Sequence, residues 1–245
     1  RMVARDGARL VMLGTPNRGS WEIVRLLVSQ AGTLKQLALL DLTNDRRELL
    51  EVIREFPGVL ELLPEDPRDF FAEGVWKRLH AHDEAERDQW GLPGQGRPAA
   101  ADRTWLRQAG QAREWLRDQA IDPDGMIYVA GHAPETPSDV KEAKGRRWWF
   151  GGERKRLQFF VSGRGDSSVL WDDGLLPGVP TWYAPGIGHG DLAKEPALFG
   201  AVEDLLVRGR TEARSLQREA PVARDLPLGE DPEHAAVVED RLAGA

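Results

Sequence analysis

The sequence Gly-Arg-Gly-Asp-Ser-Ser-Val at positions 163–169 decides how the rest of this chain is interpreted. It places Asp166 in a glycine-rich turn directly after the apolar run Leu157 to Val161. Further along, His189 stands in a second glycine-rich turn, Gly-Ile-Gly-His-Gly at 186–190. Glycine permits positive φ angles and lets the backbone approach another molecule closely. A carboxylate and an imidazole in two such turns, each after a predicted strand, indicate a polar site at the edge of a sheet.

The composition of the chain limits the classes of protein to which it can belong. Its 245 residues can build one substantial domain, or one domain with a large insertion, and 41% hydrophobic residues suit a globular protein. No apolar run approaches the ~18 residues that span a bilayer. The net charge of -7 argues against a general nucleic-acid binder. The absence of cysteine excludes disulfides and thiol nucleophiles, and it favours a cytoplasmic location.

One local segment, residues 141–156, departs from this acidic balance. Seven of its residues are basic and two are acidic, and it contains Trp148, Trp149 and Phe150. A solvated hairpin with an aromatic base explains this composition. The alternative is a surface that contacts anionic lipid head groups at a membrane, or the acidic surface of a partner.

The predicted elements run in the order strand, long helical block, three strands and final helix. Short apolar runs bounded by glycine or proline predict strands at Ala8–Leu13, Met126–Ala130, Leu157–Ser162 and Thr181–Ala184. Apolar residues at helical spacing predict helices within 21–63 and at 69–80, 104–119 and 196–208. A parallel sheet does not usually need a crossover of about a hundred residues, so the helical block is interpreted as an insertion.

These elements predict an α/β fold with an interrupted core. Residues 1–19 form the first part of the core, and residues 121–208 form the second part, which carries Asp166 and His189. Residues 20–120 are the helical insertion. The charged and proline-containing composition of residues 209–245 predicts a disordered tail or linker.

Several motifs resemble those of a known family. The sequence Leu-Gly-Thr-Pro-Asn-Arg-Gly-Ser at 13–20 resembles a loop of α/β-hydrolase lipases, especially of the lecithin:cholesterol acyltransferase-like branch. Residues 165–169 resemble that family's Gly-Asp-Gly-Thr-Val, whose aspartate is the acid of a catalytic triad, with Ser167 and Ser168 replacing glycine and threonine. The sequence His-Gly-Asp-Leu at 189–192 resembles the motif that carries the triad base. The resemblance covers roughly residues 1–207.

The resemblance implies the fold and activity of a serine hydrolase. The fold would be the C-terminal part of an α/β-hydrolase sheet, with a helical cap in residues 20–120. The activity would be attack on a carboxylic ester, as in a lipase, an esterase or an acyltransferase, with a hydrophobic ester or lipid as substrate. Asp166 would be the triad acid and His189 the triad base. No metal or organic cofactor is implied.

The chemistry of these side chains gives their expected roles. A serine hydroxyl is a poor nucleophile at neutral pH, so it needs a base such as His189 to take its proton. Asp166 would hold the imidazole in one tautomer and stabilise the imidazolium. Asp172 and Asp173 remain alternative acids, because they lie with Asp166 in the connection between the predicted strands at 157–162 and 181–184. Asp191 is a weaker alternative, since it lies two residues from the histidine and suits capping.

Substrate contacts are expected from four further residues. Three of them, Thr15, Pro16 and Asn17, lie in the loop after the first strand, and His132 follows the strand at 126–130. No Gly-x-Ser-x-Gly occurs in the sequence, and its serines lack the strand–turn–helix context of a nucleophile. We therefore expect the nucleophile several positions before residue 1, which is not a start methionine.

Two alternatives concern function and metals. The chain could be a non-catalytic, hydrolase-like binding module of a larger protein, because a fold does not fix a function. His80 and His82 lie near acidic residues, but side chains two positions apart diverge on a helix. His80 and Glu84 share a face, yet two ligands do not complete a zinc site. We therefore expect no metal.

Overall fold

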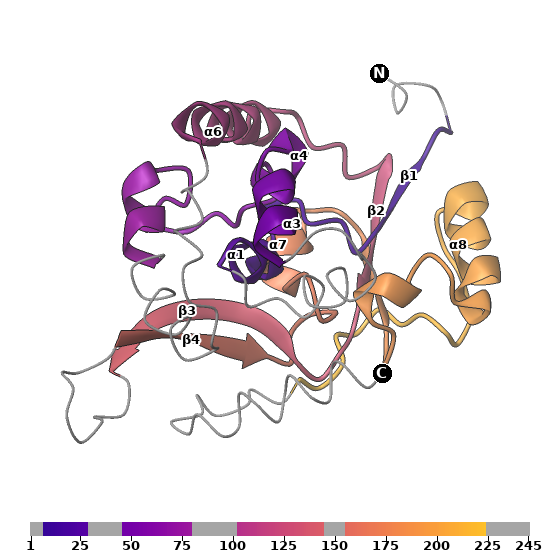
Figure 1. Ribbon diagram of the computed structural model, residues 1–245. Coiled ribbons are helices and arrows are strands. Elements are labelled where there is room, and N and C mark those ends of the chain that lie inside the picture. The colour runs from indigo at the N-terminus through magenta and orange to yellow at the C-terminus, as the bar shows by residue number, and fades with distance from the viewer. Residues whose placement is uncertain (1–6, 29–45, 80–101, 145–154, 224–245) are drawn as a thin grey trace. The chain divides into compact units, whose positions relative to one another are not determined.

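The computed structural model describes residues 7–28, 46–79, 102–144 and 155–223. These residues form helices and strands that divide into two compact units (Figure 1). The first unit takes its described residues from Arg1–Ser20, Asp118–Ser138 and Val161–Pro227. The second unit takes its described residues from Trp21–Arg117 and Asp139–Phe160.

A three-stranded parallel sheet in the order β1-β2-β5 forms the centre of the first unit. β2 (Met126–Gly131) lies between β1 (Leu10–Leu13) and β5 (Thr181–Ala184). β2 is apolar and almost entirely buried, as is typical of a central strand in a parallel sheet. All three strands run in the same direction, so their carboxyl ends lie at one edge. The segments with Thr15, His132 and His189 start from this edge, whereas the turn with Asp166 follows a strand outside this sheet. Helices with a parallel sheet agree with the predicted α/β class.

The helix α8 (Pro196–Arg208) packs beside β1 in the first unit (Figure 1). A proline stands in its first turn, and the Glu195 side chain accepts a hydrogen bond from the N–H of Ala197 at 3.2 Å. The helix ends at Gly209, whose φ of 72° is left-handed. Its inner face joins the side chains of the sheet in one core, which contains Ile127, Val129, Ala184, Leu192, Leu198, Ala201, Leu205 and Leu216.

The folded chain extends further toward the C-terminus than the sequence predicts. Leu216 is buried in the core of the first unit. Gln217 forms an antiparallel bridge with Tyr183 of β5 through two backbone hydrogen bonds of 2.8 and 2.9 Å. The predicted tail at 209–245 is therefore wrong for its first part, where a few apolar anchors stand among charged residues. Residues 224–245 lie outside the described residues.

A second correction concerns the strand before Asp166. The sequence predicts 157–162 as a strand of the core at 121–208, but β4 (Lys155–Ser162) pairs with β3 (Thr136–Lys144) in a separate antiparallel pair. The sequence does not predict β3, because the charged residues and the proline of this strand give no apolar run. Most of this pair belongs to the second unit, so the predicted core is interrupted.

Helices make up most of the described part of the second unit. They include α1 (Trp21–Leu27), α3 (Arg46–Ile53), α4 (Pro57–Leu60) and α6 (Arg103–Arg117), and residues 73–79 are helical as well. α4 packs against α6, whose Arg113 donates a hydrogen bond to the carbonyl of Glu61. Arg68 pairs with Asp66 and Asp139 and lies over the ring of Trp21 at 5.0 Å. The helical insertion predicted at 20–120 stays a prediction, because residues 29–45 and 80–101 lie outside the described residues.

Candidate functional site

Asp166 and His189 lie in direct contact within the first unit. The Nδ1 atom of His189 is 2.9 Å from the Oδ2 atom of Asp166. The backbone N–H of His189 donates to the backbone carbonyl of Asp166 at 2.7 Å, so the two turns are joined twice. The Asp166 side chain is 2% exposed and the His189 side chain is 37% exposed. The predicted proximity of the two side chains is confirmed, and their catalytic role stays a prediction.

The turn that carries Asp166 is closed by its own carboxylate. Oδ1 accepts hydrogen bonds from the N–H of Ser168 at 3.1 Å and of Val169 at 2.7 Å. The N–H of Asp166 donates back to the carbonyl of Val169 at 3.1 Å. Ser167, between them, has a φ of 79°, in the left-handed region that favours glycine. The carboxylate is therefore oriented by the backbone, with Oδ2 left for the imidazole.

Gly14 and Gly131 give the pair room at the carboxyl ends of β1 and β2. Gly14 has a φ of 60°, and a Cβ atom there would lie 2.7 Å from Leu192 Cδ1 and 2.8 Å from Asp166 Oδ2. A Cβ atom on Gly131 would lie 2.7 Å from the Cβ of Asp166. The pair therefore packs directly on the ends of parallel strands, where open α/β sheets usually bind ligands.

The contact with Asp166 changes the protonation of His189. The hydrogen bond to the carboxylate raises the pKa of His189 above its ordinary value, while burial of the ring opposes that rise. Within the described ranges, Nδ1 is the one ring nitrogen of His189 that has a hydrogen-bond partner. A proton on Nδ1 leaves Nε2 as an acceptor, which is the arrangement of a general base oriented by an acid.

The other acidic residues considered as partners of His189 lie elsewhere. Asp172 is largely exposed and faces an arginine at 3.5 Å. Asp191 is exposed as well and pairs with a lysine at 2.9 Å. Asp173 forms no hydrogen bond with the imidazole, whose partner in the described part of the chain is Asp166. The geometry therefore favours Asp166 over these three alternatives.

The loop after β1 carries three of the predicted substrate contacts, Thr15, Pro16 and Asn17. The Asn17 amide donates to the carbonyl of Gly174 at 2.6 Å, at the end of the short helix α7 (Trp171–Gly174). The carbonyl of Thr15 accepts from the hydroxyl of Tyr128 at 3.0 Å. The carbonyl of Pro16 accepts from a backbone N–H three residues later, at 3.0 Å. These bonds fix the loop that follows Gly14, the glycine in contact with Asp166 and His189.

His132, the fourth predicted contact, directly follows β2. Its backbone N–H donates to the carbonyl of Ile187 at 2.9 Å, which ties it to the turn that precedes His189. Its ring centroid is 5.9 Å from that of Trp171. The indole of Trp171 is buried and donates to the carbonyl of Gly131 at 2.8 Å. The structure therefore brings His132 to the strand ends that carry the pair.

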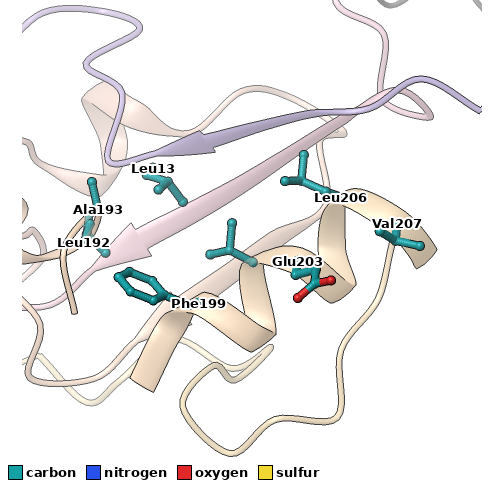
Figure 2. Close-up of a pocket in the computed structure, with 8 residues that line it drawn as sticks. Leu13, Leu192, Ala193, Phe199, Glu203, Leu206 and Val207 are labelled. Atoms are coloured by element: carbon teal, nitrogen blue, oxygen red, sulfur yellow. The ribbon is translucent and has the colours of Figure 1, made fainter. Parts of the chain in front are cut away.

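An apolar pocket of about 300 Å³ lies between β1, the turn after His189 and α8 (Figure 2). Glu203 is its charged lining residue, and the remaining lining residues are Leu13, Leu192, Ala193, Phe199, Val202, Leu206 and Val207. Leu192 also packs against Gly14, so the pocket adjoins the site. None of the four predicted substrate contacts lines it.

Two neighbours of the pair have no signal in the sequence analysis. Trp171 is an aromatic residue in a helix too short for a periodic pattern. Thr136 is completely buried, and its hydroxyl oxygen accepts the N–H of Ser167 at 2.9 Å. The sequence marks this region by its glycine-rich turns and by the motifs at 13–20, 165–169 and 189–192, none of which includes Trp171 or Thr136.

Three further expectations concern metals and membranes. Among the described residues, no group of three or more metal-ligating side chains could hold a metal ion, and His80 and His82 lie outside them. No helix in the described ranges is long and apolar enough to cross a membrane. Most of the basic segment 141–156 lies outside the described residues. In the part that is described, Lys141 faces Asp139 at 3.7 Å.

Comparisons with known proteins add no identification. No protein-family model matches the chain, and no curated protein matches its sequence significantly. The function is therefore argued from the geometry around Asp166 and His189.

Proposed function

We propose that Asp166 and His189 are the acid and base of a Ser–His–Asp triad in a serine hydrolase that acts on carboxylic esters. The observation that carries the proposal is the 2.9 Å contact between Oδ2 of a buried carboxylate and Nδ1 of a half-exposed imidazole. The place of this contact, at the carboxyl ends of parallel strands, supports it. The likeness of residues 165–169 and 189–192 to motifs of lecithin:cholesterol acyltransferase-like lipases supports it as well.

In the proposed reaction, His189 carries one proton in each of two steps, formation of the acyl-serine and its release. Nε2 takes the proton of a serine hydroxyl while the serine oxygen attacks the ester carbonyl. The tetrahedral intermediate collapses as Nε2 gives that proton to the departing alcohol, which leaves an acyl-serine. In the second half of the reaction, the oxygen of water or of an acceptor alcohol attacks the acyl carbonyl while Nε2 takes its proton, and Nε2 then gives that proton to the departing serine oxygen. Asp166 keeps Nδ1 protonated and stabilises the imidazolium in both steps.

The serine must come from outside the described residues. Within them, no serine hydroxyl forms a hydrogen bond with His189. The serine that directly follows the acid, Ser167, carries the backbone strain of the acid turn. Ser20 donates its hydroxyl to the carbonyl of Ser168. These observations fit serines that build the acid side of the site rather than the nucleophile.

We extend the proposal to the helical unit and to the substrate. In this proposal, residues 20–120 are the cap of an α/β-hydrolase, and the substrate is a hydrophobic ester or lipid. The apolar pocket beside Leu192 supports an apolar ligand near the pair. No step requires a metal or an organic cofactor.

The same chain supports a second candidate, a non-catalytic hydrolase-like binding module. The observation that favours it is the lack of a serine partner for Nε2 of His189 among the described residues. Such a module would keep the Asp166 turn for its structure alone. The two candidates differ in whether a serine becomes reactive when the imidazole is intact.

A fluorophosphonate probe separates them in the complete product of the gene. A triad serine attacks the phosphorus and displaces fluoride, and peptide mass mapping then identifies that serine. We expect His189→Ala and Asp166→Asn each to slow labelling and ester turnover at least a thousandfold, on the order expected for a triad member. The double variant is expected to lose little more than His189→Ala, because triad members act as a unit.

The matched control is Asp172→Asn, which changes the largely exposed acid of the same connection and leaves labelling unchanged. Unchanged labelling in His189→Ala would refute the triad. A complete gene product that is neither labelled nor active on esters of short and long acyl chains would establish the binding module instead.

A further inference from the structure

Among the three residues after Asp166, one backbone N–H is not held by the Asp166 carboxylate. Oδ1 takes the N–H groups of Ser168 and Val169, at 3.1 and 2.7 Å. The N–H of Ser167 instead donates to Oγ1 of Thr136 at 2.9 Å. A buried N–H without a partner is unfavourable, so this hydroxyl completes the hydrogen bonding of the turn.

Ser167 is also the strained residue of the turn. Its φ of 79° is left-handed, and Asp69 is the other residue besides glycine with a positive φ in the described part of the chain. Such a conformation persists only where neighbouring groups hold it. The hydrogen bond that the N–H of Ser167 donates to Thr136 holds the peptide group next to this φ angle, so it restrains the conformation directly.

Two neighbours, Pro137 and Gly165, allow Thr136 to make this contact. Pro137 follows it, and a residue before proline is confined to extended backbone, which suits the first residue of β3. Its side chain is 0% exposed. On the other side, a Cβ atom on Gly165 would lie 2.6 Å from Thr136 Oγ1 and 2.7 Å from its Cγ2. Only a glycine at position 165 therefore lets the hydroxyl reach the turn.

We propose that Thr136 is a positioning residue for the acid–base pair, an inference that rests on the triad proposed above. Its hydroxyl oxygen holds the N–H of Ser167, fixes the strained turn and so aims Oδ2 of Asp166 at Nδ1 of His189. Thr136 touches neither the imidazole nor a reacting atom. It acts through the carboxylate, which distinguishes it from the catalytic residues.

The test is the titration of His189 in the 245-residue chain, followed by NMR of the imidazole. The chain has five histidines, so the His189→Gln variant identifies the signal. Thr136→Val keeps the shape of the side chain but removes the acceptor. We expect its His189 to bind a proton about threefold more weakly, a fall of about half a pH unit. Thr136→Ser restores the acceptor and is expected to titrate as the original chain does.

Thr211→Val is the matched control, because Thr211 is also buried and its Oγ1 accepts the N–H of Ala213 at 3.1 Å. It is expected to lower the unfolding midpoint and leave the His189 titration unchanged. If Thr136→Val lowers the midpoint in the same way without moving the titration, Thr136 is structural only and the proposal is wrong.

If Thr136→Val does not fold, the His189 titration is compared between Ser167→Gly and the double variant of Ser167→Gly with Thr136→Val. Ser167→Gly removes the strain of the turn, so Thr136→Val is then made in that background. A double variant whose His189 titrates as in Ser167→Gly alone would overturn the proposal. The titration needs no ester turnover, so its result is independent of the fluorophosphonate test of the triad.

Discussion

Gly14 and His189 are so close that a Cβ atom on Gly14 would lie 3.0 Å from Nδ1 of the imidazole. The same atom would lie 2.8 Å from Oδ2 of Asp166, on the other side of the hydrogen bond. The end of β1 is thus in contact with both partners at once. A side chain at position 14 must displace at least one of them.

Gly14→Ala is therefore expected to be much more destabilising than Gly186→Ala. Both glycines have positive φ, 60° and 74°, but a Cβ on Gly186 would meet nothing within 4 Å. Backbone strain alone costs about 1–2 kcal/mol at Gly186, and overpacking adds about 1–3 kcal/mol at Gly14. Urea unfolding of the two variants measures the difference. Equal losses would show that the chain around Gly14 relaxes freely.

Ser167 offers a test of strain at the acid turn. Ser167→Gly relieves a left-handed φ of 79° but adds freedom to the unfolded chain, so the free energy of unfolding is expected to stay equal or rise by up to ~1 kcal/mol. Ser167→Val is expected to lose about 2 kcal/mol, because a β-branched residue is a strong outlier at this φ. Urea unfolding compares them, with Ser167→Ala as the control for the hydroxyl. A valine variant as stable as the glycine variant would contradict the turn conformation.

The pH dependence of stability follows from the raised pKa of His189. Its folded pKa lies above the unfolded value, so the contact with Asp166 contributes fully below the unfolded pKa of about 6.5. That contribution is lost as pH rises through the folded pKa. The difference in free energy of unfolding between the original chain and His189→Gln is therefore expected to be largest below about pH 6 and to shrink toward alkaline pH. A difference that is constant with pH would contradict the assigned contact.

Leu205 and Leu206 are adjacent in α8 but differ in burial. Leu205 is 0% exposed in the core, whereas Leu206 is 45% exposed. Leu205→Ala is expected to cost about 2–5 kcal/mol, and Leu206→Ala less than about 1 kcal/mol. Urea unfolding of the two variants reads out the orientation of the helix. Similar losses at both positions would mean that the exposed face is covered in solution.

The sequence predicts the parts of this fold in which chemistry and pattern coincide. β1, β2 and β5 are short apolar runs that end at glycine or proline, and each was expected within a few residues of its position. Asp166 and His189 stand in glycine-rich turns, and such turns restrict the choice of acid even before the fold is known. The α8 helix has proline at its start and glycine at its end, which fix its bounds.

The parts that the sequence does not predict depend on contacts distant in the chain. The apolar run of β4 reads the same whether the strand joins the parallel sheet or pairs with β3. Leu216 gives no periodic pattern, yet it anchors the segment after α8 in the core. Thr136 precedes the acid by thirty residues, and its link to the site is the hydrogen bond from the N–H of Ser167, which depends on the folded turn. Local pattern cannot report such pairings.

The bridge between Gln217 and Tyr183 decides in which direction the parallel sheet can grow. It occupies the outer side of β5, so an added strand has to join at β1, which has no second neighbour among the described residues. Leu10 and Gly14 donate their N–H groups toward β2, so the N–H and C=O groups of the alternate residues Val11 and Leu13 point to the other side of β1. A strand that joined in parallel would end beside Gly14. Growth of the sheet by one strand would therefore deliver whatever follows that strand to the imidazole of His189.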